Sequence, residues 1–111
     1  MIPKRIIEVV PVSQSLATAL AYSLDINRPF KLCSVEYHFD GAITKTATIT
    51  RDANAGTNYD TVLSTTALSA ATDHVFRPTG ECVFVKGDKL LVACEASAGI
   101  TVYVEIFYIE E

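Results

Sequence analysis

The chain has 111 residues, of which 50% are hydrophobic and 20% are charged, and its formal net charge at pH 7 is −4. This length fits one domain with a single core, and a composition with 11 Val, 9 Ile and 12 Thr excludes a coiled coil, a collagen-like repeat and a multidomain enzyme. The acidic balance and the lack of a basic stripe argue against binding to nucleic acid or to a membrane surface.

Alternating apolar and polar residues predict three strands in the first part of the chain. The first is the apolar run 6–12, closed by Pro11 and Ser13, and the second covers 16–26. The third is the clearest, because one face holds only large apolar side chains or cysteine, at Cys33, Val35, Tyr37 and Phe39. Asp40-Gly41 predicts a hairpin turn that sets Phe39 opposite Ile43, in a return strand whose other face is a row of threonines, Thr44, Thr46, Thr48 and Thr50.

The second half of the chain continues the same strand-and-turn pattern. We expect a loop over 51–58, a strand over 59–63, an ambiguous stretch with one short helical turn over 64–72, a short edge piece over 75–77, a hairpin from 82–85 and 89–96, and a last strand over 100–109. About eight short antiparallel strands result. The predicted fold is an all-β sandwich over residues 1–111, with a jelly-roll or another Greek-key order.

Three cysteines, Cys33, Cys82 and Cys94, lie inside apolar stretches. An odd count without a Cys-x-x-Cys pair argues against a disulfide framework or a zinc site, and we expect free, buried thiols. If the protein were secreted, one disulfide bond between two of these cysteines would still be possible. The N-terminal run does not fit a signal peptide, because Glu8 and Pro11 interrupt its apolar part, and we expect a protein that is made and assembled in the cytoplasm.

The last strand is more apolar than one buried face requires. Its even positions, 100 to 108, are assigned to the core, yet Tyr103, Phe107 and Ile109 lie at odd positions that should face water. With Leu91 of the preceding strand they form a predicted outer strip, and exposed apolar patches mark protein–protein contacts. We predict subunit contacts over residues 90–109 and over the N-terminal segment 1–12, which contains Ile6 and Ile7. The alternative is that the N-terminal run or residues 64–72 cover the strip within one subunit.

Catalytic and metal-binding patterns are weak. His38 shares an outward face with Glu36 and Asp40, and His74 follows Asp73, but neither has a second histidine nearby and no Gly-x-Ser-x-Gly elbow is present. The run Asp52-x-Asn54-x-Gly56 lacks the remaining ligands of a calcium loop. We predict no catalytic residue, no metal and no cofactor; a pocket joining His38 or His74 to carboxylates of another strand would instead indicate an enzyme.

The tyrosines leave a second kind of function open. Alternation places Tyr22, Tyr37 and Tyr108 inward, so that Tyr59 and Tyr103 remain for stacking on a sugar. Two tyrosines without tryptophan make a small aromatic platform. The alternative prediction is therefore a carbohydrate-binding or other surface-ligand-binding module.

Four stretches resemble small virion proteins of tailed bacteriophages, and together they cover most of the chain from residue 16 onward. They are Tyr22-Ser-Leu-Asp-Ile-Asn-Arg-Pro-Phe-Lys-Leu-Cys-Ser-Val-Glu-Tyr-His-Phe39, Asn58-Tyr-Asp-Thr-Val-Leu63, Val85-Lys-Gly-Asp-Lys-Leu-Leu-Val92 and Ile100-Thr-Val-Tyr-Val-Glu-Ile-Phe-Tyr108. The resemblance implies a non-enzymatic piece of a virion, such as a capsid decoration subunit or a head, neck or tail component. Its implied partners are further copies of itself, for instance in a trimer, and other capsid or tail proteins.

Overall fold

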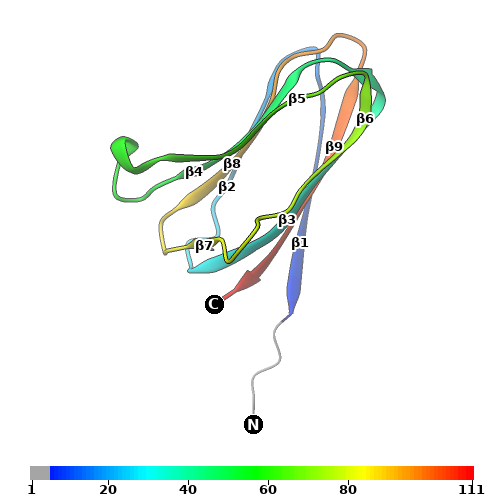
Figure 1. The fold of residues 1–111 in the computed structure, drawn as a ribbon. Helices are drawn as coiled ribbons and strands as arrows, with labels where there is room; N and C mark the ends of the chain where they lie inside the picture. The colour runs from blue at the N-terminus through cyan, green and yellow to red at the C-terminus, as the bar shows by residue number, and fades with distance from the viewer. Residues whose placement is uncertain (1–5) are drawn as a thin grey trace.

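Two antiparallel sheets pack face to face in the computed structural model of the protein, which describes residues 6–111 (Figure 1). A short 3₁₀ turn, η1 (Thr57–Tyr59), lies in the loop between two strands of the four-stranded sheet. The strands of the five-stranded sheet are β1 (Ile7–Ser15), β9 (Thr101–Glu110), β3 (Phe30–Ile43), β6 (Ala71–Phe76) and β7 (Val83–Phe84). Those of the four-stranded sheet are β2 (Leu20–Leu24), β8 (Lys89–Cys94), β4 (Thr46–Asp52) and β5 (Thr61–Ala67).

The strand order is that of a jelly roll. The five-stranded sheet runs β1-β9-β3-β6, with the two-residue β7 also paired to β3, and the other sheet runs β2-β8-β4-β5. The chain therefore changes sheets at most connections, and β4–β5 is the sequential hairpin within one sheet. Eight main strands in two sheets confirm the predicted all-β sandwich of jelly-roll type; β7 is the additional ninth strand.

Strict alternation along β9 and β3 fills the core between the sheets. Val102, Val104 and Ile106 are each at most 1% exposed, and Tyr37 and Phe39 of β3 are buried opposite Val104 and Val102. Each such side chain contributes roughly 1.5–3 kcal/mol when it is removed from water. At one end of the core the rings of Phe30 and Phe84 stack with centroids 4.5 Å apart. The inward assignment of the last strand is thus confirmed.

The predicted turn at Asp40-Gly41 is wrong. β3 continues to Ile43, and β4 begins at Thr46 in the other sheet, so Phe39 lies opposite Val102 and not opposite Ile43. Gly41 serves a close approach instead, because a Cβ at this position would come within 2.7 Å of Ile100 Cδ1. The Asp40 side chain accepts a hydrogen bond of 2.9 Å from the backbone N–H of Thr101, which ties β3 to the start of β9.

The first strands also differ from their predicted bounds. β1 runs through Pro11 to Ser15, which is allowed because β1 is an edge strand and proline disturbs only an inner one. Only residues 20–24 of the predicted strand 16–26 are extended, since Leu16 is buried where the chain crosses between the sheets. A bulge between Leu32 and Ser34 removes Cys33 from the inward alternation. The three cysteines are free, as predicted, but only Cys94 is buried.

Two predictions for the second half are wrong as well. No helical turn forms over 64–72, where β5 and β6 flank the buried Leu68; the turn lies at η1 instead. The predicted hairpin from 82–85 and 89–96 does not exist, because β7 pairs with β3 while β8 pairs with β2 and β4. The Gly-containing turn between them carries the chain from one sheet to the other. The local sequence does not show whether such a turn joins two strands of one sheet or two strands of different sheets.

Candidate contact surface on the outer face of the five-stranded sheet

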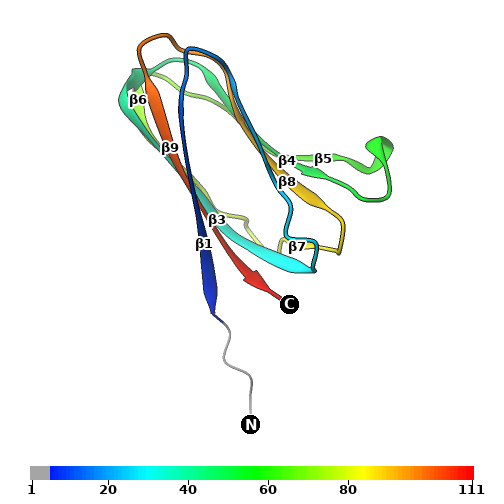
Figure 2. The ribbon, with the colours of Figure 1, turned by 180° about the vertical axis from the view of Figure 1, so that it is seen from behind.

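The register between β1 and β9 places apolar side chains side by side on the outer face of the five-stranded sheet. Ile7 lies opposite Ile109, and Val9 lies opposite Phe107. Directly opposite residues of an antiparallel pair share a face, so these four residues form one surface, which we call the edge patch. Ile7 is 56% exposed and Val9 is 44% exposed, whereas Phe107 and Ile109 are half-buried. Seen from behind, β1 and β9 run together along this side of the molecule (Figure 2).

The predicted outer strip is only partly realised. Tyr103, Phe107 and Ile109 all lie on the outer face of β9, but Leu91 lies in β8 of the other sheet, between Ser23 and Thr50. Leu91 therefore faces the opposite side of the sandwich and is not part of the same surface. The sequence pattern missed this because it treated β8 and β9 as neighbours, whereas the chain crosses between the sheets after β8.

Neither predicted covering segment lies over the edge patch. The described part of the N-terminal run extends the sheet beside β9 as β1, and residues 64–72 belong mainly to β5 in the other sheet and to the far edge strand β6. Ile6 directly precedes β1 and is 65% exposed, next to Ile7 of the edge patch. The remaining N-terminal residues of the predicted contact segment, 1–5, lie outside the described residues.

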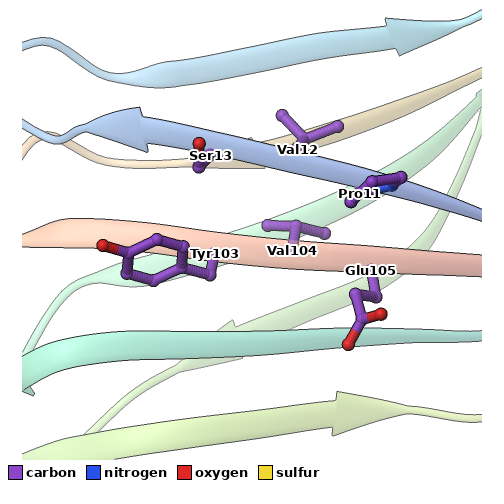
Figure 3. Close-up of a pocket in the computed structure, with 6 residues that line it drawn as sticks. All are labelled: Pro11, Val12, Ser13, Tyr103, Val104 and Glu105. Atoms are coloured by element: carbon purple, nitrogen blue, oxygen red, sulfur yellow. The ribbon is translucent and has the colours of Figure 1, made fainter.

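A shallow hollow of about 410 Å³ continues the surface along β1 and β9. Figure 3 shows Tyr103 and Glu105 on β9 beside Pro11 and Ser13 on β1. Tyr103 is 48% exposed, so one face of its ring is available for contact. The pairing of Pro11 with Glu105 and of Ser13 with Tyr103 brings these four side chains to the outer face.

An acidic hollow of about 150 Å³ lies on the other side of Tyr103. Its lining includes Glu36 and Glu105, which are directly opposite each other across β3 and β9, and Asp73 of β6. His38 donates a 2.8 Å hydrogen bond from Nδ1 to Asp73 Oδ1. This bond and a second from the Thr72 hydroxyl hold the pKa of Asp73 below its usual value. The outer face is thus apolar at the edge patch and mainly acidic in the middle of the sheet.

The His38–Asp73 pair joins a histidine to a carboxylate of another strand, the arrangement that would indicate an enzyme. A histidine oriented by a carboxylate acts as a base when a nucleophile or a water lies within its reach. The lining of the acidic hollow holds no serine, threonine or cysteine. The His38 and Asp73 side chains are 59% and 65% exposed, so water screens the pair. The geometry is that of a solvent-exposed hydrogen-bonded pair on a strand face.

The run from Asp52 to Gly56, which resembles part of a calcium loop, is held by hydrogen bonds between its backbone and carboxylates of neighbouring residues. Asp60 Oδ1 accepts from the backbone N–H of Ala53 at 2.8 Å, and Asp88 Oδ1 accepts from Asn54 at the same distance. These carboxylates stabilise the loop between β4 and β5. Within residues 6–111, no group of three or more histidine, cysteine or acidic side chains is arranged to hold a metal ion. In the same part of the chain, no helix has the length and apolar character needed to cross a bilayer.

Sequence comparison adds no relative to this picture. No protein-family model matches the chain, and no curated protein is similar to it. The β1 members of the edge patch, Ile7 and Val9, lie in the N-terminal segment 1–12 that the sequence predicted as a contact. Their alternation with Glu8 and Val10 was visible, but only the register with β9 shows which apolar residues they meet.

Proposed function

We propose that the protein is a non-enzymatic structural subunit that acts through protein–protein contacts on the outer face of the five-stranded sheet. The observation that carries this proposal is the edge patch, where Ile7–Ile109 and Val9–Phe107 form two apolar pairs on an edge strand and its neighbour. Apolar side chains gathered on an exposed face favour a partner, since their burial removes them from water.

The assembly we propose is the virion of a tailed bacteriophage, put together in the host cytoplasm. The subunit would be a capsid decoration protein or a head, neck or tail component. This part of the proposal rests on the resemblance of the four sequence stretches to small virion proteins. The jelly roll occurs in viral capsid domains and in lectins alike, so the fold is compatible with the proposal without selecting it. Many weak copies of one contact on a repeating lattice would give firm retention.

The solution mass measured by light scattering over a dilution series tests the proposal. We expect a defined oligomer, such as a trimer, that dissociates when Val9→Lys or Ile7→Lys places a charge in the edge patch. Val62→Lys is the matched control, because Val62 is 59% exposed on β5 of the other sheet. A monomer at every concentration that also fails to bind phage capsids or tails would overturn the proposal.

A second candidate is a carbohydrate-binding module. Tyr103 and Tyr59 are 48% and 64% exposed, and each lines a hollow. Exposed tyrosine rings stack on sugars, as in many lectin-like sites. Screening the labelled protein against immobilised glycans distinguishes this candidate: binding that is lost in Tyr59→Ala or Tyr103→Ala supports it, and the absence of any glycan hit removes it.

A further inference from the structure

Arg51 occupies an inward-facing position at the end of β4. It lies opposite Leu90 of β8, which is fully buried, and shares a strand face with Ala47 and Ile49 of the core. A cation therefore takes the last place in a row of core residues. The alternation from Ala47 to Ile49 to Arg51 is visible in the sequence, but residues 51–58 were expected to form a loop.

The guanidinium of Arg51 forms no hydrogen bond or ion pair with residues 6–111, although it lies near Cys82, where burial raises the pKa of the thiol and the guanidinium lowers it. Its Nε is sealed from solvent without a hydrogen bond, and Arg51 forms none of the ion pairs of the described residues. The Arg51 side chain as a whole is only half-buried. Charged groups are rarely buried unless they are paired. Stability alone does not account for an arginine at this position.

Arg51 is one of the residues that line a hollow of about 300 Å³ at the loop end of the sandwich, which we call the end hollow. Its walls come from the β4–β5 hairpin, which projects from the four-stranded sheet in Figure 1, and from the turn between β7 and β8. Most of the wall is apolar: Ala53, Ala55 and the exposed side chains of Tyr59 and Val85. This volume is at the lower end of the range of small-molecule sites.

The other charged group of the end hollow is already engaged. Asp88 is 5% exposed, and its two oxygens accept backbone hydrogen bonds from Asn54 and Val85 at 2.8 and 3.0 Å. These bonds connect the two loops, so the hollow is formed before any ligand arrives. The guanidinium remains as the charged group with donors to offer. The fixed negative charge of Asp88 repels a dianion such as phosphate more strongly than it repels a monoanion.

We propose that the end hollow binds a carboxylate carried on a compact apolar or ring-shaped body. The two Nη atoms of Arg51 donate to the two carboxylate oxygens, a match of planar groups that arginine makes well. Tyr59 and Val85 contact the body of the ligand. This site lies at the hairpin end and on different elements from the edge patch, so it adds a ligand-binding role to the proposed structural one and is tested independently of it.

Titration of the ¹⁵N-labelled full chain with phenylacetate, followed by amide NMR shifts, tests the proposal. We expect saturable shifts confined to residues 53–60 and 85–88. Arg51→Met should weaken binding at least about tenfold, and Arg51→Lys, which keeps the charge but loses the planar fork, by a smaller factor. Arg77→Met is the matched control, because Arg77 is an exposed arginine outside the end hollow. Its affinity should equal that of the unaltered protein.

Ligand variants separate the two parts of the recognition. Acetate, which lacks the body, and phenylacetamide, which lacks the charge, should each bind more weakly than phenylacetate, and Tyr59→Ala should weaken phenylacetate but not acetate. Glucuronate tests whether a sugar can carry the carboxylate. The proposal is overturned if phenylacetate causes no shift in a folded protein, if Arg51→Met and Arg51→Lys both bind it unchanged, or if phenylacetamide binds equally well.

Discussion

Glu36 of β3 lies directly opposite Glu105 of β9 on the outer face of the five-stranded sheet, and neither carboxylate forms an ion pair within residues 6–111. Like charges in directly opposite positions of a sheet repel each other. The repulsion acts at the centre of the surface that we propose as a contact. In an isolated subunit this repulsion therefore lowers the stability of the pairing between β3 and β9.

Removing one of these charges should stabilise the isolated protein. Glu105→Gln keeps the shape of the side chain, and we expect the free energy of unfolding to rise by about 0.2–1 kcal/mol in low salt. Urea unfolding at low and high ionic strength measures this change, which should shrink in high salt because ions screen exposed charges. Glu110→Gln is the control: Glu110 pairs with Arg28 at 3.4 Å, so this variant should gain nothing. An equal gain in both variants would contradict the explanation.

The hydrogen bonds to Asp73 predict a pH-dependent contribution to stability. They lower the pKa of this carboxyl from its ordinary 3.8 in the folded protein, so its contribution is fully present above that value and is lost as the pH falls through the folded pKa. Asp73→Asn should therefore be less stable than the unaltered protein near neutral pH, and the difference should vanish in acid. Unfolding curves from neutral pH to pH 2 measure it.

Burial of Tyr37 predicts a loss of stability in alkali. Tyr37 is 2% exposed, and burial, followed by the nearby Cys94, raises the pKa of its hydroxyl far above the ordinary 10.0. A raised pKa means that the folded state resists deprotonation, so stability is lost as the pH rises above the unfolded value. Burial also raises the pKa of Tyr108, so ultraviolet titration of tyrosinate should show more than one tyrosine with delayed ionisation, and Tyr37→Phe should reduce the amplitude that appears only when the protein unfolds. Ionisation of every tyrosine in the folded protein would show this reasoning to be wrong.

Two glycines with positive φ should differ in their tolerance of alanine. Gly87 has φ of +93°, and a Cβ there would lie 2.6 Å from Cγ of Asn54, whereas Gly99 has φ of +81° with open space around it. Gly99→Ala should cost only backbone strain, about 1 kcal/mol, and Gly87→Ala should cost more, about 2–3 kcal/mol, because the Asn54 side chain must also move. Thermal unfolding of both variants gives the comparison. A Gly99→Ala variant as unstable as Gly87→Ala would rule out the contact with Asn54 as the cause.

The core was predictable because alternation is a local property. The even-numbered residues from Val102 to Tyr108 face inward as their spacing indicates, since every second side chain of a strand points to the same side. Partners across strands were not predictable. Whether Leu91 and Tyr103 share a face, or whether His38 meets Asp73, depends on crossings between sheets that the sequence does not specify. The candidate surface was therefore anticipated on β9 and in the N-terminal segment, but the pairing of Ile7 with Ile109 and of Val9 with Phe107 was not.

Arg51 lies at a core-facing position although its charged side chain is more stable in water, and the effect of this placement on the free energy of unfolding can be measured. An unsatisfied, sealed Nε–H lowers stability by roughly 1–3 kcal/mol. Arg51→Met fills the same space without a charge, so we expect it to raise the free energy of unfolding by about 1 kcal/mol, as apolar replacement of buried charges often does. Arg51→Lys, which keeps a charge between the sheets, should give no such gain.

Urea unfolding with and without phenylacetate connects this stability effect with the proposed site. A ligand that binds only the folded state stabilises it in proportion to the logarithm of its saturation. Phenylacetate should thus raise the unfolding midpoint of the unaltered protein and, at the same concentration, raise that of Arg51→Met much less. If Arg51→Met were strongly destabilised, the side chain would be a structural element of the core, and its placement between the sheets would be explained by packing. A stable variant that no longer responds to phenylacetate would show that the arginine is kept for what it binds.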